Sequence, residues 1–319
     1  MFSFTIRSFL QKLVTLLFIS IISFLVVYLA PGEPSQIDPL NPKFTPDDLV
    51  KFRQEFNLDK PLQVQYYLFY KNLFTGELKS WKDNQPVLGK IHERFMNSLW
   101  LFIVGTIITW CLSFPVGIGA AIKRGSVFDR TTTFFAYVLI SIPSFFFAYI
   151  IIIFVVQTFN VPVIGMHTFG MAQASEFYRI MDRIWHLVIP SILGALGGIA
   201  LLSRYVRAQM LEVIHQDYIR TAQAKGLSGD RVYYRHALRN ALLPFVTMFG
   251  LILPGLIGGS VIIESIFAWP GMGRMGYEAI IARDYPIIIA LNFIAAVLTL
   301  IGTFISDLLY MVVDPRIRL

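Results

Sequence analysis

Long apolar runs alternate with polar segments along this chain of 319 residues. A helix needs roughly 20 mainly apolar residues to cross the hydrocarbon core of a bilayer. Six segments meet this requirement, namely residues 9–30, 98–122, 131–158, 187–203, 241–264 and 286–312. The pattern therefore predicts an all-α, polytopic membrane protein with six transmembrane helices. The fourth segment is short and rich in glycine, so its limits are the least sharply defined.

The polar segments divide the chain into three parts. Residues 1–30 comprise a cytoplasmic N-terminus and the first span, and residues 31–97 form a sizeable extracytoplasmic loop. Residues 98–319 form a core of five further spans, interrupted by a polar cytoplasmic loop over residues 204–240. We expect this loop to be the part of the chain that a soluble partner contacts.

The distribution of Lys and Arg predicts the orientation. With a cytoplasmic N-terminus, the inside segments carry 14 basic and five acidic residues, whereas the outside segments carry 13 of each. An excess of basic residues on one side is the positive-inside pattern. The formal net charge of +7 is therefore a signal of topology, with both termini in the cytoplasm, and not of nucleic-acid binding.

Composition sets further limits. Hydrophobic residues make up 55% of the chain and charged residues 15%, which is too little polar surface for a globule in water. The single cysteine, Cys111, cannot form an internal disulfide. No phosphate-binding loop of the G-x-x-x-x-G-K-[ST] type occurs, so the sequence predicts no ATP site and no cofactor in this chain. The five histidines lack metal-ligand spacing, and we expect no metal site.

The loop over residues 204–240 contains two predicted helices. Asp217 is a favourable N-cap, and Gly226 stands where a left-handed residue would end a two-turn helix. Ser228 can cap a second helix, whose basic residues recur every four positions and share one face. This basic stripe, Arg231, Arg235 and Arg239, could bind lipid phosphates or an acidic partner, or be a solvated surface.

A tight turn follows the fifth predicted span. Trp269, Pro270, Gly271 and Gly273 lie there beside apolar residues, in the segment over residues 265–285. One hypothesis is an outer gate, with Trp269 anchored at the membrane interface and the glycines allowing close backbone packing. The other is a rigid connector that only joins two spans.

Several motifs in this chain carry a family resemblance. They are YIRTAQAKGL at 218–227, HALRNALLP at 236–244, LAPG at 29–32, the stretch 264–273, RDYP at 283–286, DLLY at 307–310 and DPRIR at 314–318. Together they resemble ABC importer permeases of the oligopeptide, dipeptide and nickel branch over nearly the whole chain. Arg220-Thr221-Ala222 replaces the Glu-Ala-Ala of the general permease pattern, a departure usual in the peptide branch.

The resemblance implies a type I ABC importer permease fold and a bacterial-type inner membrane. It implies that a coupling helix docks in a cleft of a separate ATPase subunit through Tyr218, Ile219, Arg220, Thr221, Ala222, Ala224, Lys225, Gly226 and Leu227. The implied partners are two ATPase subunits that hold ATP and Mg²⁺, a second homologous permease subunit, an extracytoplasmic binding protein and membrane lipids. The implied cargo is a dipeptide or oligopeptide, or alternatively nickel or another small solute.

Two other classes of protein fit the sequence less well. An ion-gradient-driven transporter usually carries ionisable residues at mid-depth in the membrane. Here Glu264 and Asp307 lie near span ends. A membrane hydrolase requires a nucleophile with a base, or paired carboxylates, within the spans. The spans show neither arrangement, so we expect a transport subunit and not an enzyme.

Overall fold

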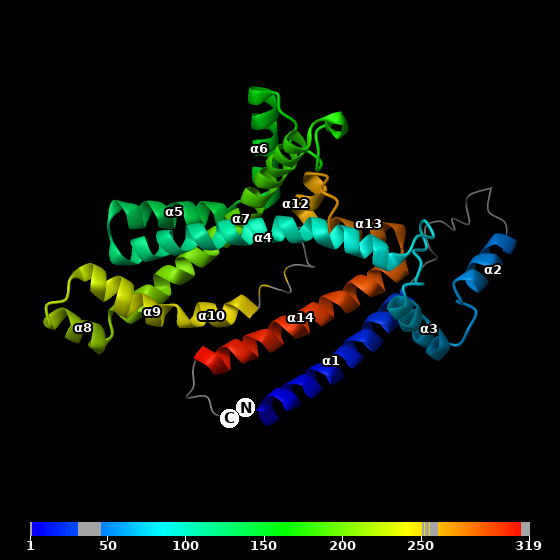
Figure 1. Ribbon diagram of the computed structural model, residues 1–319, viewed down its shortest axis with the longest axis horizontal. Coiled ribbons are helices and arrows are strands. Elements are labelled where there is room, and N and C mark those ends of the chain that lie inside the picture. Colours follow the sequence, from blue (N-terminus) through cyan, green and yellow to red (C-terminus); the bar gives the residue numbers. More distant parts are fainter. Residues whose placement is uncertain (1, 31–45, 251, 253–254, 256–260, 314–319) are drawn as a thin grey trace.

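The computed structural model describes residues 2–30, 46–250, 252, 255 and 261–313. This part of the chain is helical and contains no β-strand (Figure 1). Its main helices are α1 (Phe2–Tyr28), α2 (Pro46–Glu55), α3 (Leu62–Thr75), α4 (Val87–Ile122), α5 (Val127–Ser141), α6 (Ser144–Phe159), α7 (Glu176–Ile214), α8 (Asp217–Ala224), α9 (Leu238–Ala241), α10 (Leu243–Gly250), α12 (Val261–Ile266), α13 (Met272–Ala282) and α14 (Tyr285–Val313). Two short elements, the 3₁₀-helix η1 (Met171–Gln173) and the π-helix η2 (Arg231–Ala237), complete the set.

Among the described residues, four helices are long and apolar enough to cross a membrane: α1, α4, α7 and α14. The pair α5 and α6 makes a fifth crossing if it is counted as one span. The fifth span predicted from the sequence, residues 241–264, lies partly outside the described residues. The structure thus supports an all-helical protein with four to five apolar spans.

The third predicted span, residues 131–158, is not one straight helix. α5 and α6 meet at 98°, with Ile142 and Pro143 between them. Proline has no N–H to donate to the helix and disfavours the helical conformation of the residue before it. Ile142 accordingly adopts an extended conformation, with φ −95° and ψ 126°. The prediction of a continuous helix was wrong because Pro143 breaks the hydrogen-bond ladder.

The fourth predicted span, residues 187–203, proves to be the middle of a much longer helix. α7 runs for 39 residues and includes Pro190. It therefore begins eleven positions before the predicted span, at Glu176, and continues for eleven positions into the predicted cytoplasmic loop, to Ile214. Hydrophobicity marks only the lipid-compatible part of a helix, whereas backbone hydrogen bonds continue through its polar ends.

α4 and α7 form the central pair of the fold. Gly117 of α4 lies directly against α7: a Cβ at this position would come within 2.5 Å of the Ser203 carbonyl oxygen and 2.7 Å of the Val206 Cβ. The hydroxyl of Ser113, one turn earlier, donates to the Ile199 carbonyl at 3.3 Å. Small residues at membrane helix interfaces let backbones approach and pack closely. The close approach at Gly117 therefore fixes how α4 crosses α7.

A second pair, α1 and α14, lies side by side at the lower edge of Figure 1. Near their ends beside the termini, Lys12 of α1 donates to Asp307 of α14 at 2.7 Å, and Ser8 donates to the same carboxylate at 3.1 Å. At the opposite ends of the pair, α3 packs on both helices. There the hydroxyl of Tyr70 donates to the Ser20 carbonyl at 3.2 Å.

The segment after α3 is hydrogen-bonded to the residue that precedes α14. Asp284 is buried between α13 and α14, accepts a hydrogen bond from the Ser80 hydroxyl and accepts another from the Trp81 amide at 3.0 Å. The polar insert over residues 46–86 is therefore bound to the helical bundle through specific contacts.

We predict that Gly117→Ala destabilises the protein by about 2 kcal/mol, because the added methyl group overlaps α7 and forces the helices apart. Gly197→Ala is the matched control, since a Cβ there meets no atom within 4 Å. Alanine is the better helix former, so the control should match or exceed the parent in stability. Thermal unfolding of the detergent-purified variants measures the difference, and equal midpoints for both variants would refute this view of the α4–α7 contact.

Candidate functional site

The predicted coupling helix is present as α8, an eight-residue helix in the loop after α7. Gly226 ends it in the left-handed conformation, with φ +77°. Its amide donates to the Gln223 carbonyl at 2.9 Å, and the Leu227 amide donates to the Ala222 carbonyl at 3.4 Å. This pair of hydrogen bonds is the Schellman motif, in which glycine avoids the steric cost of a positive φ. The sequence-based prediction of Gly226 as the terminating residue is confirmed.

The predicted start of α8 is wrong by one residue. Gln216 is the N-cap, in an extended conformation, and Asp217 is the first helical residue. Asp217 still favours the helix, because a carboxylate in the first turn interacts well with the positive end of the helix dipole. Its ion pair with Arg220 spans 3.5 Å, but both side chains are largely exposed, so it contributes little stability.

The two faces of α8 differ. Ile219 and Ala222 are buried and pack against the rest of the loop and the end of α7. Leu227 is half-buried, and the other residues assigned to coupling are exposed: Tyr218, Arg220, Thr221, Ala224, Lys225 and Gly226. Ile219, Ala222 and part of Leu227 therefore hold the helix in place, and the six exposed residues form the surface available to a partner.

The second predicted helix of the loop differs from expectation. Residues Arg231–Ala237 form the π-helix η2, and only Leu238–Ala241 continue as the α-helix α9. The buried residues Val232 and Ala237 are five positions apart, the same separation as the i→i+5 hydrogen bonds of a π-helix. A prediction based on α-helical spacing could not detect this wider turn. The basic stripe, Arg231, Arg235 and Arg239, is nevertheless exposed along its whole length.

The loop shares one apolar core with the central helix pair. Ile219 and Val232 from the loop pack in a cluster with Ile118 of α4 and with Val206 and Met210 of α7. On the same end of α7, Arg207 binds Asp129 of α5 with two hydrogen bonds of 2.7 and 2.9 Å. α8 therefore shares a core with α4 and α7, and α5 is joined to this core through the Arg207–Asp129 ion pair on α7.

The predicted outer turn is bound to α4 by a set of hydrogen bonds that we call the outer knot. It joins Asn97 and Ser98 of α4 to the segment 264–274. The Trp269 indole donates to the Asn97 backbone carbonyl at 3.1 Å, and the Asn97 side-chain amide Nδ2 donates to the Pro270 backbone carbonyl at 2.9 Å. Ser98 donates to Glu264 at 2.8 Å and accepts from the Met272 amide at 2.7 Å.

Glu264 is the centre of the outer knot. Its side chain is fully buried, and its second carboxylate oxygen accepts from the Arg274 amide at 2.8 Å. A Cβ on Gly271 would lie 2.4 Å from the Glu264 carboxyl carbon, and one on Gly273 would lie 3.0 Å from the Val261 amide nitrogen. The glycines thus leave room for a carboxylate and for the α12 backbone.

The expectation that Trp269 anchors the turn at the membrane interface is wrong. Trp269 is only 3% exposed and belongs to a core cluster with Phe267, Ile263 and Leu101. Tryptophan prefers the interface because one edge of its ring needs a hydrogen-bond acceptor. Here the Asn97 carbonyl supplies that acceptor inside the protein.

Sequence reasoning assigned no role to Asn97, Ser98 or Asp129, and it treated Glu264 only as an acid near a span end. The signal for Glu264 was present, because an acid in an apolar segment requires partners. One of its partners, Ser98, lies 166 positions away, and no local pattern could identify it. Among the described residues, no cluster of His, Cys, Asp or Glu has the geometry of a metal site.

Comparison with known proteins assigns the family. Residues 113–319 match the family described as binding-protein-dependent transport system inner membrane component. Residues 1–113 match the corresponding N-terminal family of these membrane components. The chain belongs to this family of permease subunits, which transport solutes and are not catalytic. Such an importer works with ATPase and substrate-binding partners, and the chain is an inner-membrane, multi-pass protein.

Individual relatives cover the whole chain. The oligopeptide transport system permease protein AppB of Bacillus subtilis is 39% identical over 320 residues, covering 100% of both chains. The dipeptide transport system permease protein DppB of Escherichia coli K12 is 34% identical, covering 100% of this chain and 99% of the relative. A solved structure of the inward-facing MetNI methionine ABC transporter aligns with a TM-score of 0.53 and 18% identity, covering 72% of this chain and 99% of the other. This structural likeness shows the fold alone.

We predict that Gly271→Ala destabilises the protein by about 1–3 kcal/mol, because the methyl group displaces the Glu264 carboxylate from its donors. Gly276→Ala in α13 is the control, since its added Cβ makes only an ordinary contact, at 3.5 Å, with Leu291. Thermal unfolding of the purified proteins compares them. A Gly271→Ala protein as stable as the control would show that Glu264 does not require this space.

Proposed function

We propose that this chain is a pore-forming subunit of an ATP-driven importer for dipeptides or oligopeptides. The observation that carries the proposal is the full-length similarity to an oligopeptide and a dipeptide permease, at 39% and 34% identity. Those two relatives favour peptides over nickel as the cargo. The exposed face of α8 supports the assignment of a docking helix for an ATPase subunit, because this face carries polar and aromatic side chains that are open to solvent.

Transport proceeds by alternating access in this proposal. A loaded binding protein docks on the outer loops, and closure of two ATP-loaded ATPase subunits moves α8. Because α8 shares a core with α4 and α7, its displacement turns that pair as a unit. Rigid-body motion of packed helices then opens the pathway first outward and afterwards inward.

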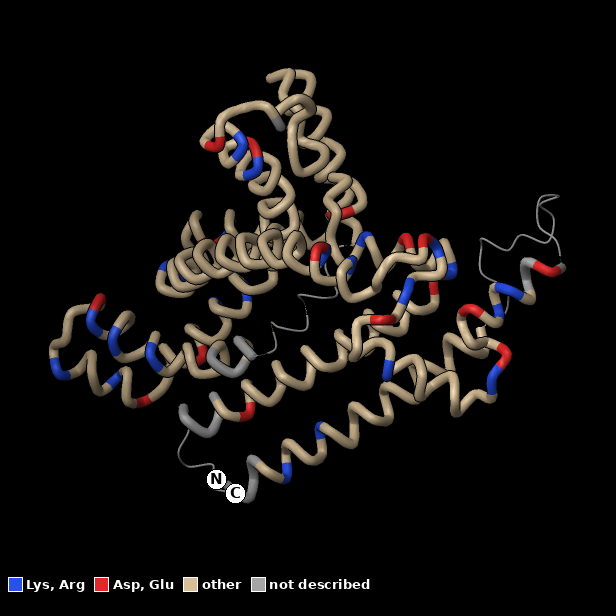
Figure 2. The backbone as a smooth tube through the Cα atoms, turned by 45° about the vertical axis from the view of Figure 1, so that its right-hand side comes forward, with Lys and Arg blue, Asp and Glu red and all other residues tan. Residues whose placement is uncertain are grey.

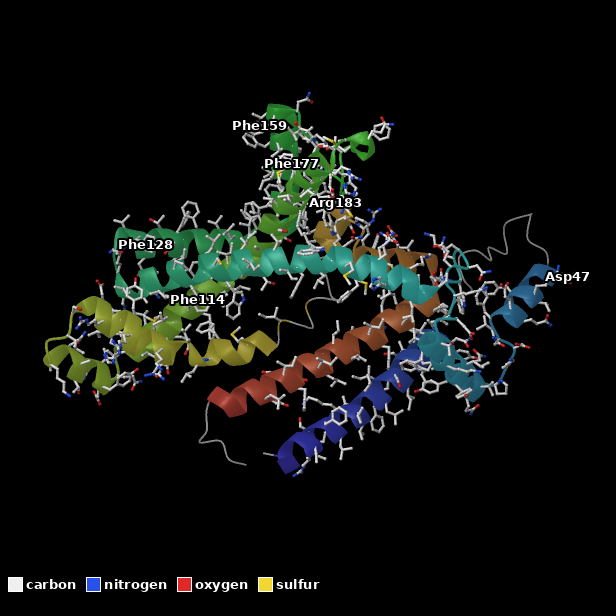
Figure 3. The ribbon with its side chains drawn as sticks, in the orientation of Figure 1. Asp47, Phe114, Phe128, Phe159, Phe177 and Arg183 are labelled. Carbon is white, nitrogen blue, oxygen red and sulfur yellow. The ribbon has the colours of Figure 1, made fainter. Side chains whose placement is uncertain are left out.

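A second permease subunit completes the pore in this proposal. Large apolar side chains are exposed along α5, α6 and the first turns of α7, including Phe128, Phe159 and Phe177 (Figure 3). Such a surface is stable only against lipid or another membrane protein. The basic stripe, Arg231, Arg235 and Arg239, is placed beside α8, where lipid phosphates or an acidic partner surface would neutralise it.

The orientation is part of the same proposal, with both termini in the cytoplasm. Figure 2 shows Lys and Arg concentrated at the end of the molecule that carries α8 and η2, whereas acidic and basic residues mix around α2 and α3. This arrangement agrees with a cytoplasmic α8 and an extracytoplasmic insert.

The outer knot closes the outer mouth in this proposal, with Trp269, Pro270, Gly271 and Gly273 moving together with α4. The Gly271→Ala variant tests this role as well. If the outer knot is a gate, weakening it raises the rate of ATP hydrolysis measured without binding protein, relative to the rate measured with binding protein. An unchanged ratio of these two rates would show that the turn is only a connector.

Gly226→Val is the variant that tests the docking function of α8. Valine resists a positive φ, at a cost of about 1–3 kcal/mol, so the end of α8 should unwind. Since a Cβ at Gly226 meets no atom within 4 Å, the effect is one of backbone conformation and not of crowding. We expect peptide import and stimulated ATP hydrolysis to fall at least about tenfold, while membrane insertion is retained.

The control for this experiment is Gly229→Val in the same loop, where φ is not positive and a Cβ lies 3.6 Å from the Tyr233 ring. It should keep most of the parental import. Parental transport by Gly226→Val would exclude α8 as the docking element.

Thiol labelling tests the orientation. In a Cys111→Ala background, cysteines that replace Lys82 and Arg231, both exposed, should react with an impermeant thiol reagent from opposite faces of the membrane. Intact cells should label position 82, and inverted vesicles position 231. Reaction of both positions from one side would contradict the proposed topology.

A further inference from the structure

The loop between α6 and α7, residues 160–170, is attached to the first turns of α7 by a buried carboxylate. Asp182 of α7 is 8% exposed, and its two oxygens accept from the Thr168 amide at 2.9 Å and from the Thr168 hydroxyl at 2.6 Å. The Trp185 indole also donates to the Pro162 carbonyl at 2.9 Å. These contacts hold the loop against α7.

The same loop contacts the segment around the outer turn. The Gly165 amide donates to the Phe267 carbonyl at 2.7 Å. Val163 is buried in the core cluster that contains Phe267 and Trp269. The loop therefore links the first turns of α7 to the segment that forms the outer knot, and its attachment to α7 helps to hold this link in place.

Two histidines flank the Asp182 carboxylate. The Nδ1 atoms of His186 and His167 lie 3.4 and 3.9 Å from its oxygens. Nδ1 of the buried His186 also lies 2.8 Å from the Asp182 main-chain carbonyl, which can only accept, so this nitrogen carries the proton. Its Nε2 has no hydrogen-bond partner among the described residues, so a second proton there would be a donor without an acceptor. The His167 side chain is 45% exposed and can take up a proton from water.

The charged groups that act on His167 come from α7. They are the Asp182 carboxylate and the Arg183 guanidinium, together with His186 when that ring is protonated. Residues 160–175 contain no other ionisable side chain, and α6 contains no charged one. The charged residues that flank the outer turn bind one another: Glu264, Arg274 and Glu278.

These surroundings disfavour a proton on His167. Partial burial and the positive charge of Arg183 lower the pKa of this imidazole below its usual value of about 6.5, and Asp182 acts in the opposite direction but more weakly. A proton therefore binds more tightly to His167 when the loop is free in water than when the loop is attached to α7. By linkage, the attachment is strongest above about pH 6.5 and weakens as the pH falls below this value toward the lowered pKa.

We propose that Thr168, Asp182 and His167 form a proton-sensitive latch, in which a proton on His167 releases the loop from α7. Before protonation, the charges of Asp182 and Arg183 balance each other. The added proton leaves one surplus positive charge in a half-buried site, and separation of the loop from α7 lets water solvate this charge. With the proposed orientation the loop lies outside the cytoplasm, so the acidity of the exterior controls the latch. This inference goes beyond the import function and does not depend on the cargo.

Spin labelling measures the release of the loop. A cysteine replaces Phe169, a fully exposed residue of the loop, in a Cys111→Ala background, and a nitroxide is attached to it. The whole permease–ATPase complex, with cysteine-free partner subunits, is placed in lipid nanodiscs, where both faces meet the same buffer and the result does not depend on orientation. We expect the ratio of mobile to immobile label to rise at least about threefold between about pH 7.5 and about pH 5.5. The rise should not exceed about tenfold per pH unit, the limit for uptake of one proton.

His167→Gln is the decisive variant, because glutamine keeps a polar side chain but does not titrate. Since His167 is half exposed, the substitution leaves the core intact, and the label should stay immobile over the whole pH range. His92→Gln is the matched control, since His92 is an exposed histidine at the start of α4, and it should keep the parental response.

Three outcomes would overturn the proposal. The first is a parental spectrum that does not change with pH, and the second is a label that becomes less mobile in acid. The third is a response that persists in His167→Gln, even if His186→Gln removes it, because the proton would then act at another site.

Discussion

The close contact of α4 with α7 at Gly117 is the constraint on which the rest of the structure depends. The Ser203 carbonyl oxygen of α7 occupies the space that a Cβ on Gly117 would need, so the backbones of the two helices are in close contact. Apolar side chains gain little from leaving lipid for another helix, so close packing and hydrogen bonds must hold such a pair together. The pair is therefore a rigid frame, and elements at both of its ends take their positions from it.

At one end of this frame lies α8, and at the other lies the outer knot. Ile219 anchors α8 in the core that α4 and α7 share, whereas Ser98 of α4 bonds to Glu264 and to the Met272 amide. A close-packed interior transmits displacement without absorbing it. This arrangement gives a physical path between α8 and the outer knot through one pair of helices.

Buried polar groups set the finer geometry. Each hydrogen bond in the outer knot replaces a water contact that hydrocarbon cannot supply, and an unsatisfied group would cost several kcal/mol in lipid. Asp284 with Ser80, Asp307 with Lys12 and Asp129 with Arg207 follow the same rule at three other junctions between helices. Polar pairing therefore determines where helices meet, whereas apolar packing determines how closely they approach.

Taken alone, the sequence determined the helical class, the limits of α14, the short helix after α7 and its termination at Gly226. These features are local: hydrophobic length sets a span, and a glycine with positive φ ends a helix whatever surrounds it. The break at Pro143 is local as well, because proline disfavours a helical conformation at Ile142, although hydrophobic length alone did not reveal it. The tertiary structure alone decided the π-helical turn at Val232 and the burial of Trp269. It also decided that Ser98, 166 positions away, would meet Glu264. Such outcomes depend on competition between partners distant in sequence, and a local pattern holds no information about which partner is within reach.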